Sequence, residues 1–221
     1  MAEGVPPIRL AYATTQDGRT LVRVRVKDLA GDKRVGIRGR IGEDWQEHEL
    51  SPASRHFGYD VFADTVPRPE EFAVFYHAGG ASFWDNNDGR NYRVPLWANA
   101  VGGRVCLRRA ELRAVSTARR RMHGLIYVDN VSYRKSVGVR MLPDGASRWI
   151  EFSGLYDGIA REGGGAPWVT GPAERWSFTS PPFDARGCRF AVYYRNLDSA
   201  QTYWDNNFGQ DYLFGNDLTL D

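Results

Sequence analysis

The chain has 221 residues and a formal net charge of +2, with 29 lysines and arginines interspersed among 27 aspartates and glutamates. Because nucleic acids are bound by massed positive charge, this balance argues against nucleic acid as the main partner. No run of about 18 apolar residues occurs, so no membrane span is expected. The first residues lack the apolar core of a signal peptide, and we predict a cytoplasmic location.

The predicted elements, in chain order, are short β-strands. Apolar residues alternate with period two at residues 21–26, 35–38 and 72–76, and turns with Gly, Asp and Pro bound these segments. Short strands rich in valine and aromatic residues favour an all-β sandwich or barrel.

A ten-residue pattern, aromatic-W-D-N-N-x-G-x-[ND]-Y, occurs twice, at residues 83–92 and 203–212. Each copy follows a matching apolar strand, at residues 72–76 and 190–194. Lys33 matches Lys135 at an offset of 102, and Phe62 matches Phe178 at an offset of 116. A repeat this close predicts two tandem modules, which we place at residues 1–103 and 104–221.

The repeat also assigns the segments between the strands. Residues 119–121, three arginines, match the hairpin turn at residues 17–19 and are predicted to be a loop. Insertions in the second copy collect at residues 154–172, a glycine-rich stretch that we predict to be a surface loop. Residues 98–103 are predicted to be the short joint between the modules.

Cysteines and histidines give little sign of chemistry. Cys106 and Cys188 have no counterpart in the other copy, so free buried thiols are expected rather than a disulfide. The four histidines are not repeated and show no ligand spacing. No metal, no cofactor and no catalytic residue is predicted.

Lysine usage is more informative. The chain has only three lysines against 26 arginines, yet Lys33 and Lys135 occupy the same position in the two modules. An ammonium group is a compact donor, whereas guanidinium is a broad fork. A site that needs the compact donor is one reading, and a strand-edge residue kept by chance is the other.

The order of these motifs resembles carbohydrate-binding module family 21. The resembling series is V-x-V-K-D-L-A-x-x-K-x-V-x-[IV]-R, then D-W, E-F-A-V-F-Y and W-D-N-N-x-G-x-N-Y; the second copy matches it more loosely. The family comprises starch-binding domains of amylolytic enzymes and glycogen-binding modules of phosphatase targeting subunits. The resemblance implies an immunoglobulin-like antiparallel β-sandwich that binds α-1,4-linked glucan, as starch, glycogen or maltooligosaccharide.

The resemblance also implies a set of sugar-binding residues. The lysine site corresponds to Lys33 and Lys135, and the stacking tryptophan to Trp45 and Trp149. In the second module the family's asparagine and aromatic residue before the lysine are kept as Asn130 and Tyr133. The first module has Asp28 and Gly31 there, which puts its second sugar site in doubt. The repeated element adds further candidates: Trp84, Asn86, Asn87, Asn91, Tyr92, Trp204, Asn206, Asn207, Asp211 and Tyr212.

Several of these residues have a structural reading as well. Trp84 and Trp204 flank strand ends and are read as either core or platform, whereas Trp45 and Trp149 follow turn residues and are expected to be exposed. Asp85 and Asp205 are read as turn builders, because Asx side chains bond their own backbone. Tyr156 and Trp168, in the glycine-rich stretch, are candidates for an added sugar platform.

Three functional classes follow. A non-catalytic glucan-binding protein is the leading reading. A glycosidase would need two placed carboxylates across a cleft, and no such pair is repeated. A scaffold that recruits an enzyme such as a phosphatase is the alternative; its basic-V-x-F docking segment is matched only loosely, at residues 148–152.

Overall fold

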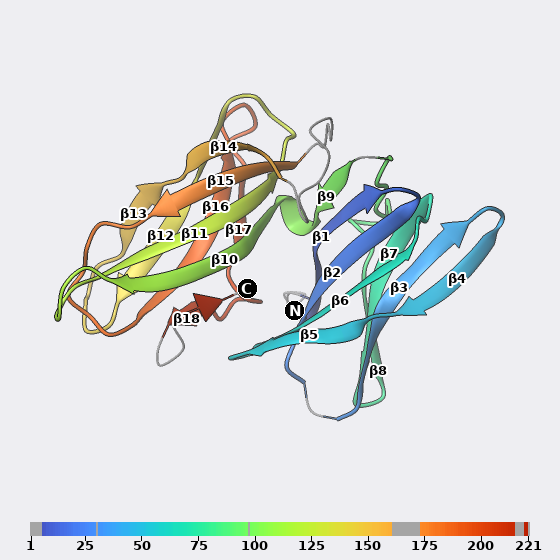
Figure 1. The fold of residues 1–221 in the computed structure, drawn as a ribbon, viewed down its shortest axis with the longest axis horizontal. Helices are drawn as coiled ribbons and strands as arrows, with labels where there is room; N and C mark the ends of the chain where they lie inside the picture. Colours follow the sequence, from blue (N-terminus) through green and yellow to red (C-terminus); the bar gives the residue numbers. More distant parts are fainter. Residues whose placement is uncertain (1–5, 30, 97, 161–172, 215–218, 221) are drawn as a thin grey trace. The chain divides into compact units, whose positions relative to one another are not determined.

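The computed structural model describes residues 6–29, 31–96, 98–160, 173–214 and 219–220. Over these residues the regular elements are β-strands, apart from one 3-10 turn, η1 (Gly102–Arg104). They form two compact units, seen separately in Figure 1. Unit 1 comprises the described residues up to Gly103 together with Ala160; unit 2 comprises residues 104–159 and those from Ala173 onward.

Unit 1 is built from two antiparallel sheets. The first sheet has the order β5-β6-β2-β1-β9; its strands are β1 (Ile8–Gln16), β2 (Arg19–Lys27), β5 (Ser51–His56), β6 (Tyr59–Pro67) and β9 (Asn99–Val101). The second sheet has the order β4-β3-β7-β8; its strands are β3 (Lys33–Ile41), β4 (Asp44–Glu49), β7 (Glu71–Ala78) and β8 (Ala81–Asp85).

The core of unit 1 lies between these sheets. Val22, Val24 and Val26, the alternate residues of β2, are fully buried and pack with Ile37 of β3 and Val74 of β7. Period-two alternation places one face of each strand inside, so the outer face of β3 and β7 is free to carry other side chains. That outer face carries the candidate site.

Unit 2 repeats this architecture. One sheet has the order β14-β15-β11-β10-β19, formed by β10 (Val105–Ala114), β11 (Arg120–Asp129), β14 (Leu155–Ile159), β15 (Ala173–Thr179) and β19 (Thr219–Leu220). The other has the order β13-β12-β16-β17, with β18 also paired to β16; its strands are β12 (Lys135–Pro143), β13 (Ile150–Ser153), β16 (Cys188–Asn196), β17 (Thr202–Asp205) and β18 (Tyr212–Phe214). The predicted all-β fold with antiparallel, immunoglobulin-like sandwiches is confirmed.

Two segments predicted as connections are instead partly strand. Residues 99–101 of the predicted joint form β9, which pairs with β1 through Tyr12 and Val101. Residues 155–159 of the predicted surface loop form β14, whose Tyr156 pairs with Trp176 of β15. An edge strand bonds on one side only, so a short, glycine-containing segment can serve as one. Residues 161–172, with Trp168, lie outside the described part of the chain.

The sheet register corrects the predicted alignment of the two copies. Val26 pairs with Asp60 in unit 1, and Val128, its counterpart at offset 102, pairs with Glu174 in unit 2. Asp60 therefore corresponds to Glu174 and Phe62 to Trp176, two residues away from the predicted match of Phe62 with Phe178. A shift of two residues keeps every side chain on its own face of the sheet, so the apolar pattern could not detect it.

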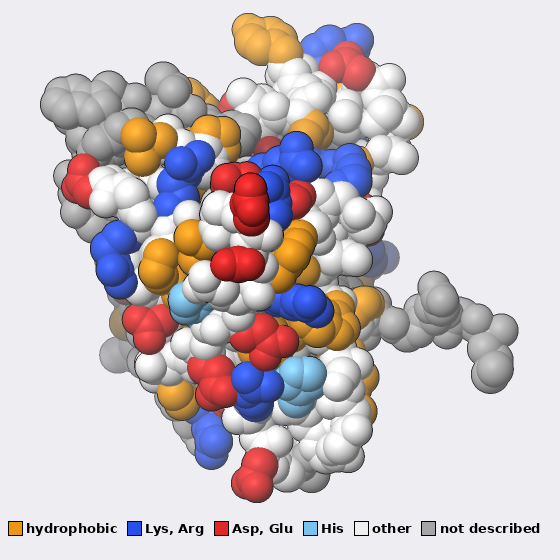
Figure 2. Space-filling view, turned by 90° about the vertical axis from the view of Figure 1, so that its right-hand side faces the viewer, with side chains coloured by type: hydrophobic (Ala, Val, Ile, Leu, Met, Phe, Trp, Pro, Cys, Tyr) orange, Lys and Arg blue, Asp and Glu red, His pale blue; other side chains and the backbone are white. Residues whose placement is uncertain are grey.

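Further expectations concern the cysteines, the three-arginine run, the charge distribution, membrane spans and metal sites. Cys106 and Cys188 are free and buried, and burial raises the pKa of Cys188 to about 12. Of residues 119–121, which are predicted to be a loop, only Arg119 lies outside a strand; Arg120 and Arg121 begin β11, where they pair with Ala114 and Arg113 of β10. On the face drawn in Figure 2 basic and acidic side chains are interspersed. No described helix is long and apolar enough to cross a membrane, and no cluster of potential metal ligands occurs among the described residues.

Candidate functional site

A groove of about 320 Å³ crosses the outer face of the β4-β3-β7-β8 sheet of unit 1. Each strand contributes one side chain in spatial order: Trp45 from β4, Arg38 from β3, Ala73 from β7 and Trp84 from β8. Asn86 and Asn91, from the turn after β8, complete the lining. Two flat rings thus flank a small residue and a cation, with two side-chain amides at one end.

The tryptophans are held at the surface by packing beneath them. Trp84 pairs across the sheet with Phe75 and packs on its ring at 5.7 Å between centroids. Phe75 is fully buried because it covers Gly36 of β3, where an added Cβ would come within 2.5 Å of its ring. The Arg38 guanidinium lies over the Trp45 ring at 6.0 Å. Both rings are thereby oriented while each keeps a free face.

Unit 2 holds the matching residues in the same arrangement. Arg140 lies over the Trp149 ring at 4.9 Å, and Trp204 packs on Tyr193 at 5.5 Å. Ala191 pairs with Arg140, as Ala73 pairs with Arg38 in unit 1. The four tryptophans are comparably exposed, at 43% for Trp45, 39% for Trp84, 36% for Trp149 and 37% for Trp204. This exposure favours the platform reading for all four.

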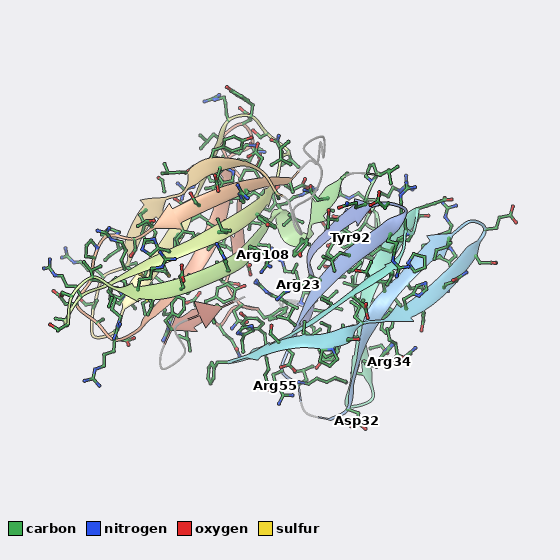
Figure 3. All side chains as sticks on the ribbon, viewed as in Figure 1. Arg23, Asp32, Arg34, Arg55, Tyr92 and Arg108 are labelled. Atoms are coloured by element: carbon green, nitrogen blue, oxygen red, sulfur yellow. The ribbon has the colours of Figure 1, made fainter. Side chains whose placement is uncertain are left out.

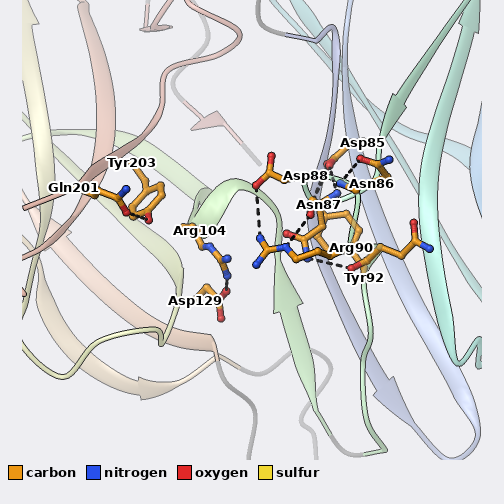
Figure 4. A network of polar contacts seen from close by, with 12 residues as sticks. Asp85, Asn86, Asn87, Asp88, Arg90, Tyr92, Arg104, Asp129, Gln201 and Tyr203 are labelled. Carbon is orange, nitrogen blue, oxygen red and sulfur yellow. Dashed lines mark hydrogen bonds and ion pairs between the residues drawn. The ribbon is translucent and has the colours of Figure 1, made fainter. Parts of the chain in front are cut away.

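The aspartates of the repeated element have a structural role that reaches across the sandwich. Asp85 accepts hydrogen bonds from the Leu10 backbone N–H at 2.7 Å and from the Tyr92 hydroxyl at 2.8 Å, as Figure 4 shows for the tyrosine. Asp205 does the same with the Leu107 N–H at 2.6 Å and the Tyr212 hydroxyl at 2.7 Å. Leu10 and Leu107 each border a β-bulge. The carboxylates therefore satisfy backbone groups of the facing sheet's first strand, which goes beyond the predicted turn.

Four of the predicted sugar contacts have internal partners in the structure, and their contact with sugar stays a prediction. Tyr92 and Tyr212 are 4% and 1% exposed, and their hydroxyls are used by the aspartates. Asn87 and Asn207 have positive φ and donate their amides to the carbonyls of residues 91 and 211, so they build the turn. Asn207 is also buried.

Asn86 and Asn206 use their side-chain oxygens within the turn, and no described residue accepts a hydrogen bond from their amide N–H groups. Asn86 Oδ1 accepts the Gly89 N–H at 3.0 Å and Asn206 Oδ1 accepts the Gly209 N–H at 3.1 Å. These bonds fix the side chains and use only the carbonyl end. Asn91 lines the groove of unit 1, and its counterpart Asp211 is half-buried. Burial raises the pKa of Asp211, while the nearby Arg189 and Arg140 oppose the shift.

The two repeated lysines lie away from these grooves and bond within their own units. Lys33 Nζ donates to Asp28 and to Asp60, and Lys135 Nζ donates to Asn130 and to Glu174, the latter at 2.9 Å. Burial alone would lower the pKa of Lys33, but the bonds to Asp28 and Asp60 outweigh it and raise the pKa. The bond from Lys33 in turn lowers the pKa of Asp28. Since an ammonium has three donors, about one is left on each lysine for a ligand.

The surroundings of the lysines differ between the units. In unit 1 a hollow of about 630 Å³ is lined by Asp28, Gly31, Asp32, Arg55 and neighbouring residues; Figure 3 shows Asp32 and Arg55 at the same end of the unit. In unit 2 the Trp176 Nε1–H donates to Glu174 at 3.0 Å and packs edge-on against Tyr156 at 5.7 Å. Tyr133 is 96% exposed. Aromatic surface is therefore available beside Lys135, whereas the hollow beside Lys33 mixes charged groups with Leu29, Pro52 and Phe62.

Sequence reasoning missed Arg38, Arg140, Ala73, Ala191 and Trp176. The first four recur at matching positions in the two copies, so the repeat itself carried the signal. Trp176 occupies the position that Phe62 has in unit 1, and this correspondence is visible only in the corrected register.

Replacing Trp45 or Trp149 by alanine is expected to weaken glucan binding by about 1–3 kcal/mol, because an aromatic stacking platform is lost. Stability should change little, since a buried tryptophan would cost about 3–5 kcal/mol on truncation and these rings are exposed. Calorimetric titration and thermal melts measure the two effects. Trp45→Phe, which keeps a flat ring, is the control; a large fall in melting temperature with unchanged binding would contradict the platform assignment.

Comparison with known proteins adds independent findings. A family model described as carbohydrate/starch-binding module (family 21) matches residues 100–215, which cover unit 2 as far as β18. Protein phosphatase 1 regulatory subunit 3C of Bos taurus is 34% identical over 99 residues, 38% of this chain and 31% of that protein. Regulatory subunit 3E of Rattus norvegicus is 40% identical over 82 residues, 32% of this chain and 29% of that protein. The match thus spans about a third of these relatives' length.

Solved structures give similar results. The starch-binding domain of Rhizopus oryzae glucoamylase, in complex with β-cyclodextrin and maltoheptaose, is 22% identical with a TM-score of 0.36; the match covers 43% of this chain and 96% of that one. The carbohydrate-binding module of the muscle glycogen-targeting subunit of protein phosphatase 1 is 24% identical with a TM-score of 0.35, covering 50% and 74%.

Proposed function

Because the chain belongs to carbohydrate/starch-binding module family 21, we propose that it binds α-1,4-linked glucan without cleaving it, at the groove of unit 1 and at the matching sheet face of unit 2. One observation carries the proposal: each unit presents two exposed tryptophans, an arginine, an alanine and an asparagine in the same order across one sheet. The proposed modules correspond to residues 1–103 and 104–221.

The groove suits a glucose chain physically. A glucose ring has an apolar C–H face, which a flat aromatic can cover at small entropic cost because the ring loses few rotamers. The hydroxyl rim needs donors and acceptors together, and the Asn86 amide and the Arg38 guanidinium supply the donors. The small Ala73 side chain leaves room between the rings for a sugar to lie. The lysine sites, above all Lys135 with Asn130, Tyr133 and Trp176, would give further contacts.

The same lining supports a non-catalytic role. Glycoside hydrolysis uses two carboxyl groups about 5–10 Å apart across the bond that is cleaved. The residues that line the groove of unit 1 include no carboxylate, and Asp85 is engaged with Leu10 and Tyr92. In the corresponding part of unit 2 Asp211 lies near Arg140, and Glu151, which faces Arg140 from β13, is ion-paired with Arg195.

Electrophoresis through native gels that contain glycogen tests the proposal. We expect the chain to be retarded in glycogen and to run normally in a gel that contains a cellulose derivative, because the grooves suit the curved α-linked chain. Incubation with soluble starch should release no reducing sugar. Equal mobility in both gels would refute the glucan assignment, and released sugar would refute the non-catalytic one.

The alternative, a scaffold that recruits an enzyme, is favoured by one observation: the relatives just named are regulatory subunits of a phosphatase. Against it, the loosely matching docking segment at residues 148–152 runs into β13, where Ile150 is paired with Met141 of β12. A paired strand is not free to dock as an extended peptide. Co-precipitation of a phosphatase catalytic subunit with the chain on glycogen would support this alternative. A cytoplasmic location stays a prediction.

A further inference from the structure

Three arginines follow one another on the outer face of β3, and one of them differs from the other two. Arg34 is paired with Glu47 and Glu49, and Arg40 with Glu70 and Glu71. Arg38, between them, makes no ion pair or hydrogen bond with any residue that the structure describes; its contact is the face of Trp45. Glutamates therefore neutralise Arg34 and Arg40, whereas the guanidinium of Arg38 is left available.

Arg38 is also the arginine that lines the groove. The other lining side chains are two tryptophans, an alanine and two asparagines, so the lining carries one cation and no carboxylate; Glu47, which faces Arg38 from β4, is paired with Arg34. The contact with Trp45 uses one side of the guanidinium, and its N–H groups have no hydrogen-bond acceptor among the described residues, so they are available to a ligand. A neutral glucan would use these donors only for hydroxyl groups and would leave the charge uncompensated.

Unit 2 offers a natural contrast at the same position. The counterpart of Asn91 is Asp211, which has the same left-handed backbone, φ 61° against 56°, and lies near Arg140 and Arg189. Its carboxylate forms no ion pair with Arg140 but lies within electrostatic range of it, so it offsets part of that charge and repels an incoming anion. Arg189 offsets part of this repulsion, whereas unit 1 has Glu71 at the matching position, engaged with Arg40 and Arg93.

We propose that the groove of unit 1 prefers α-glucan that carries a phosphomonoester, with Arg38 binding the phosphate while Trp45 and Trp84 hold the adjacent glucose rings. The proposal rests on the glucan-binding function and names its ligand more closely. A guanidinium matches a phosphate through two parallel N–H···O bonds, which a hydroxyl cannot offer. A phosphomonoester carries close to two negative charges at neutral pH and so gains more than a single carboxylate would.

Fluorine NMR of the full chain labelled with 5-fluorotryptophan can test each groove separately. The Trp45 and Trp84 signals report on unit 1 and those of Trp149 and Trp204 on unit 2, with single Trp→Phe variants giving the assignments. Titrations with maltoheptaose, with maltoheptaose bearing one 6-phosphate, and with inorganic phosphate yield a dissociation constant for each signal. At the unit 1 signals we expect the phosphorylated sugar to bind about three- to tenfold tighter than the neutral one, as suits a partly screened charge-assisted contact.

Matched variants identify the cause. Arg38→Gln should abolish the ratio between the two sugars, Arg38→Lys should keep part of it, and Asn91→Asp should reduce it. Asp211→Asn should raise the ratio at the Trp149 and Trp204 signals. The ratio is the readout, because Arg38 also contacts neutral sugar.

The outcomes separate this proposal from the function on which it rests. If neither sugar shifts the tryptophan signals, the glucan function itself fails. Equal affinities at unit 1, a preference equal in both units, or a preference that survives Arg38→Gln would overturn the phosphate proposal alone. Inorganic phosphate should shift the signals only weakly; if it binds as tightly as the phosphorylated sugar, the groove is a general anion site and the proposal is wrong.

Discussion

Replacing Asp205 by alanine is expected to lower the free energy of unfolding of unit 2 by about 3–5 kcal/mol. The carboxylate accepts the Leu107 N–H and the Tyr212 hydroxyl, all three residues being almost fully buried. Each donor left unsatisfied in the interior costs about 1–3 kcal/mol. Denaturant unfolding, followed by hydrogen exchange of the β10 amides, measures the effect in this unit.

Graded variants show whether the loss comes from these bonds. Tyr212→Phe removes a single partner and should cost about 1 kcal/mol, as for one ordinary hydrogen bond. Asp85→Ala is the matched change in unit 1 and should cost less there, because Asp85 is only half-buried. A stable Asp205→Ala chain that had lost sugar binding instead would show that the carboxylate is a ligand group and not an internal bond acceptor.

Removing the tryptophan pair of one unit is expected to reduce the affinity of the chain for glycogen strongly, because the two units bind one polymer together. When a polymer reaches two sites, the second contact becomes intramolecular, and the gain lies at about 10²–10⁴-fold. We expect the low end, so Trp45→Ala with Trp84→Ala should weaken glycogen binding about a hundredfold. The same change should leave maltoheptaose binding by unit 2 intact.

The reciprocal pair, Trp149→Ala with Trp204→Ala, is the control for unit 2. Titrations of glycogen and of maltoheptaose with the parent chain, each double variant and the quadruple variant separate the contributions. If each double variant binds glycogen as well as the parent chain, the grooves do not engage one polymer together, and one unit serves mainly as structure.

The sheets and the platforms were within reach of sequence reasoning because both leave a local signal. Period-two alternation marks Val22, Val24 and Val26 as inward-facing, and recurrence in two copies marks Trp45 and Trp149 as more than ordinary surface residues. The exposed Asn86, which recurs as Asn206, follows from the same comparison, whereas Tyr133 stands opposite Gly31 and is reached only through the family resemblance. Residues that recur at equal spacing can be recognised from a single sequence.

The internal partners of the repeated residues were out of reach. Tyr92 and Asn86 both recur in the second copy, yet the former is buried on Asp85 and the latter lines the groove. Recurrence alone cannot separate a residue that a fold needs from one that a ligand needs. The bond from Asp85 to Leu10 spans 75 positions and depends on how the two sheets face each other, which no local pattern specifies.

Ala73 and Ala191 show that the ligand preference of such a surface could change through one substitution. In each unit the methyl group of an alanine, Ala73 or Ala191, lies on the strand between the two tryptophans. A methyl group makes no hydrogen bond, so replacing it breaks none. A larger aliphatic side chain there would fill the groove from below, and a glycine would deepen it, while the aspartate bonds and the core stay as they are. Ligand fit can therefore change through a single position on β7 or β16, and one unit could acquire a new ligand while the other retains the old one.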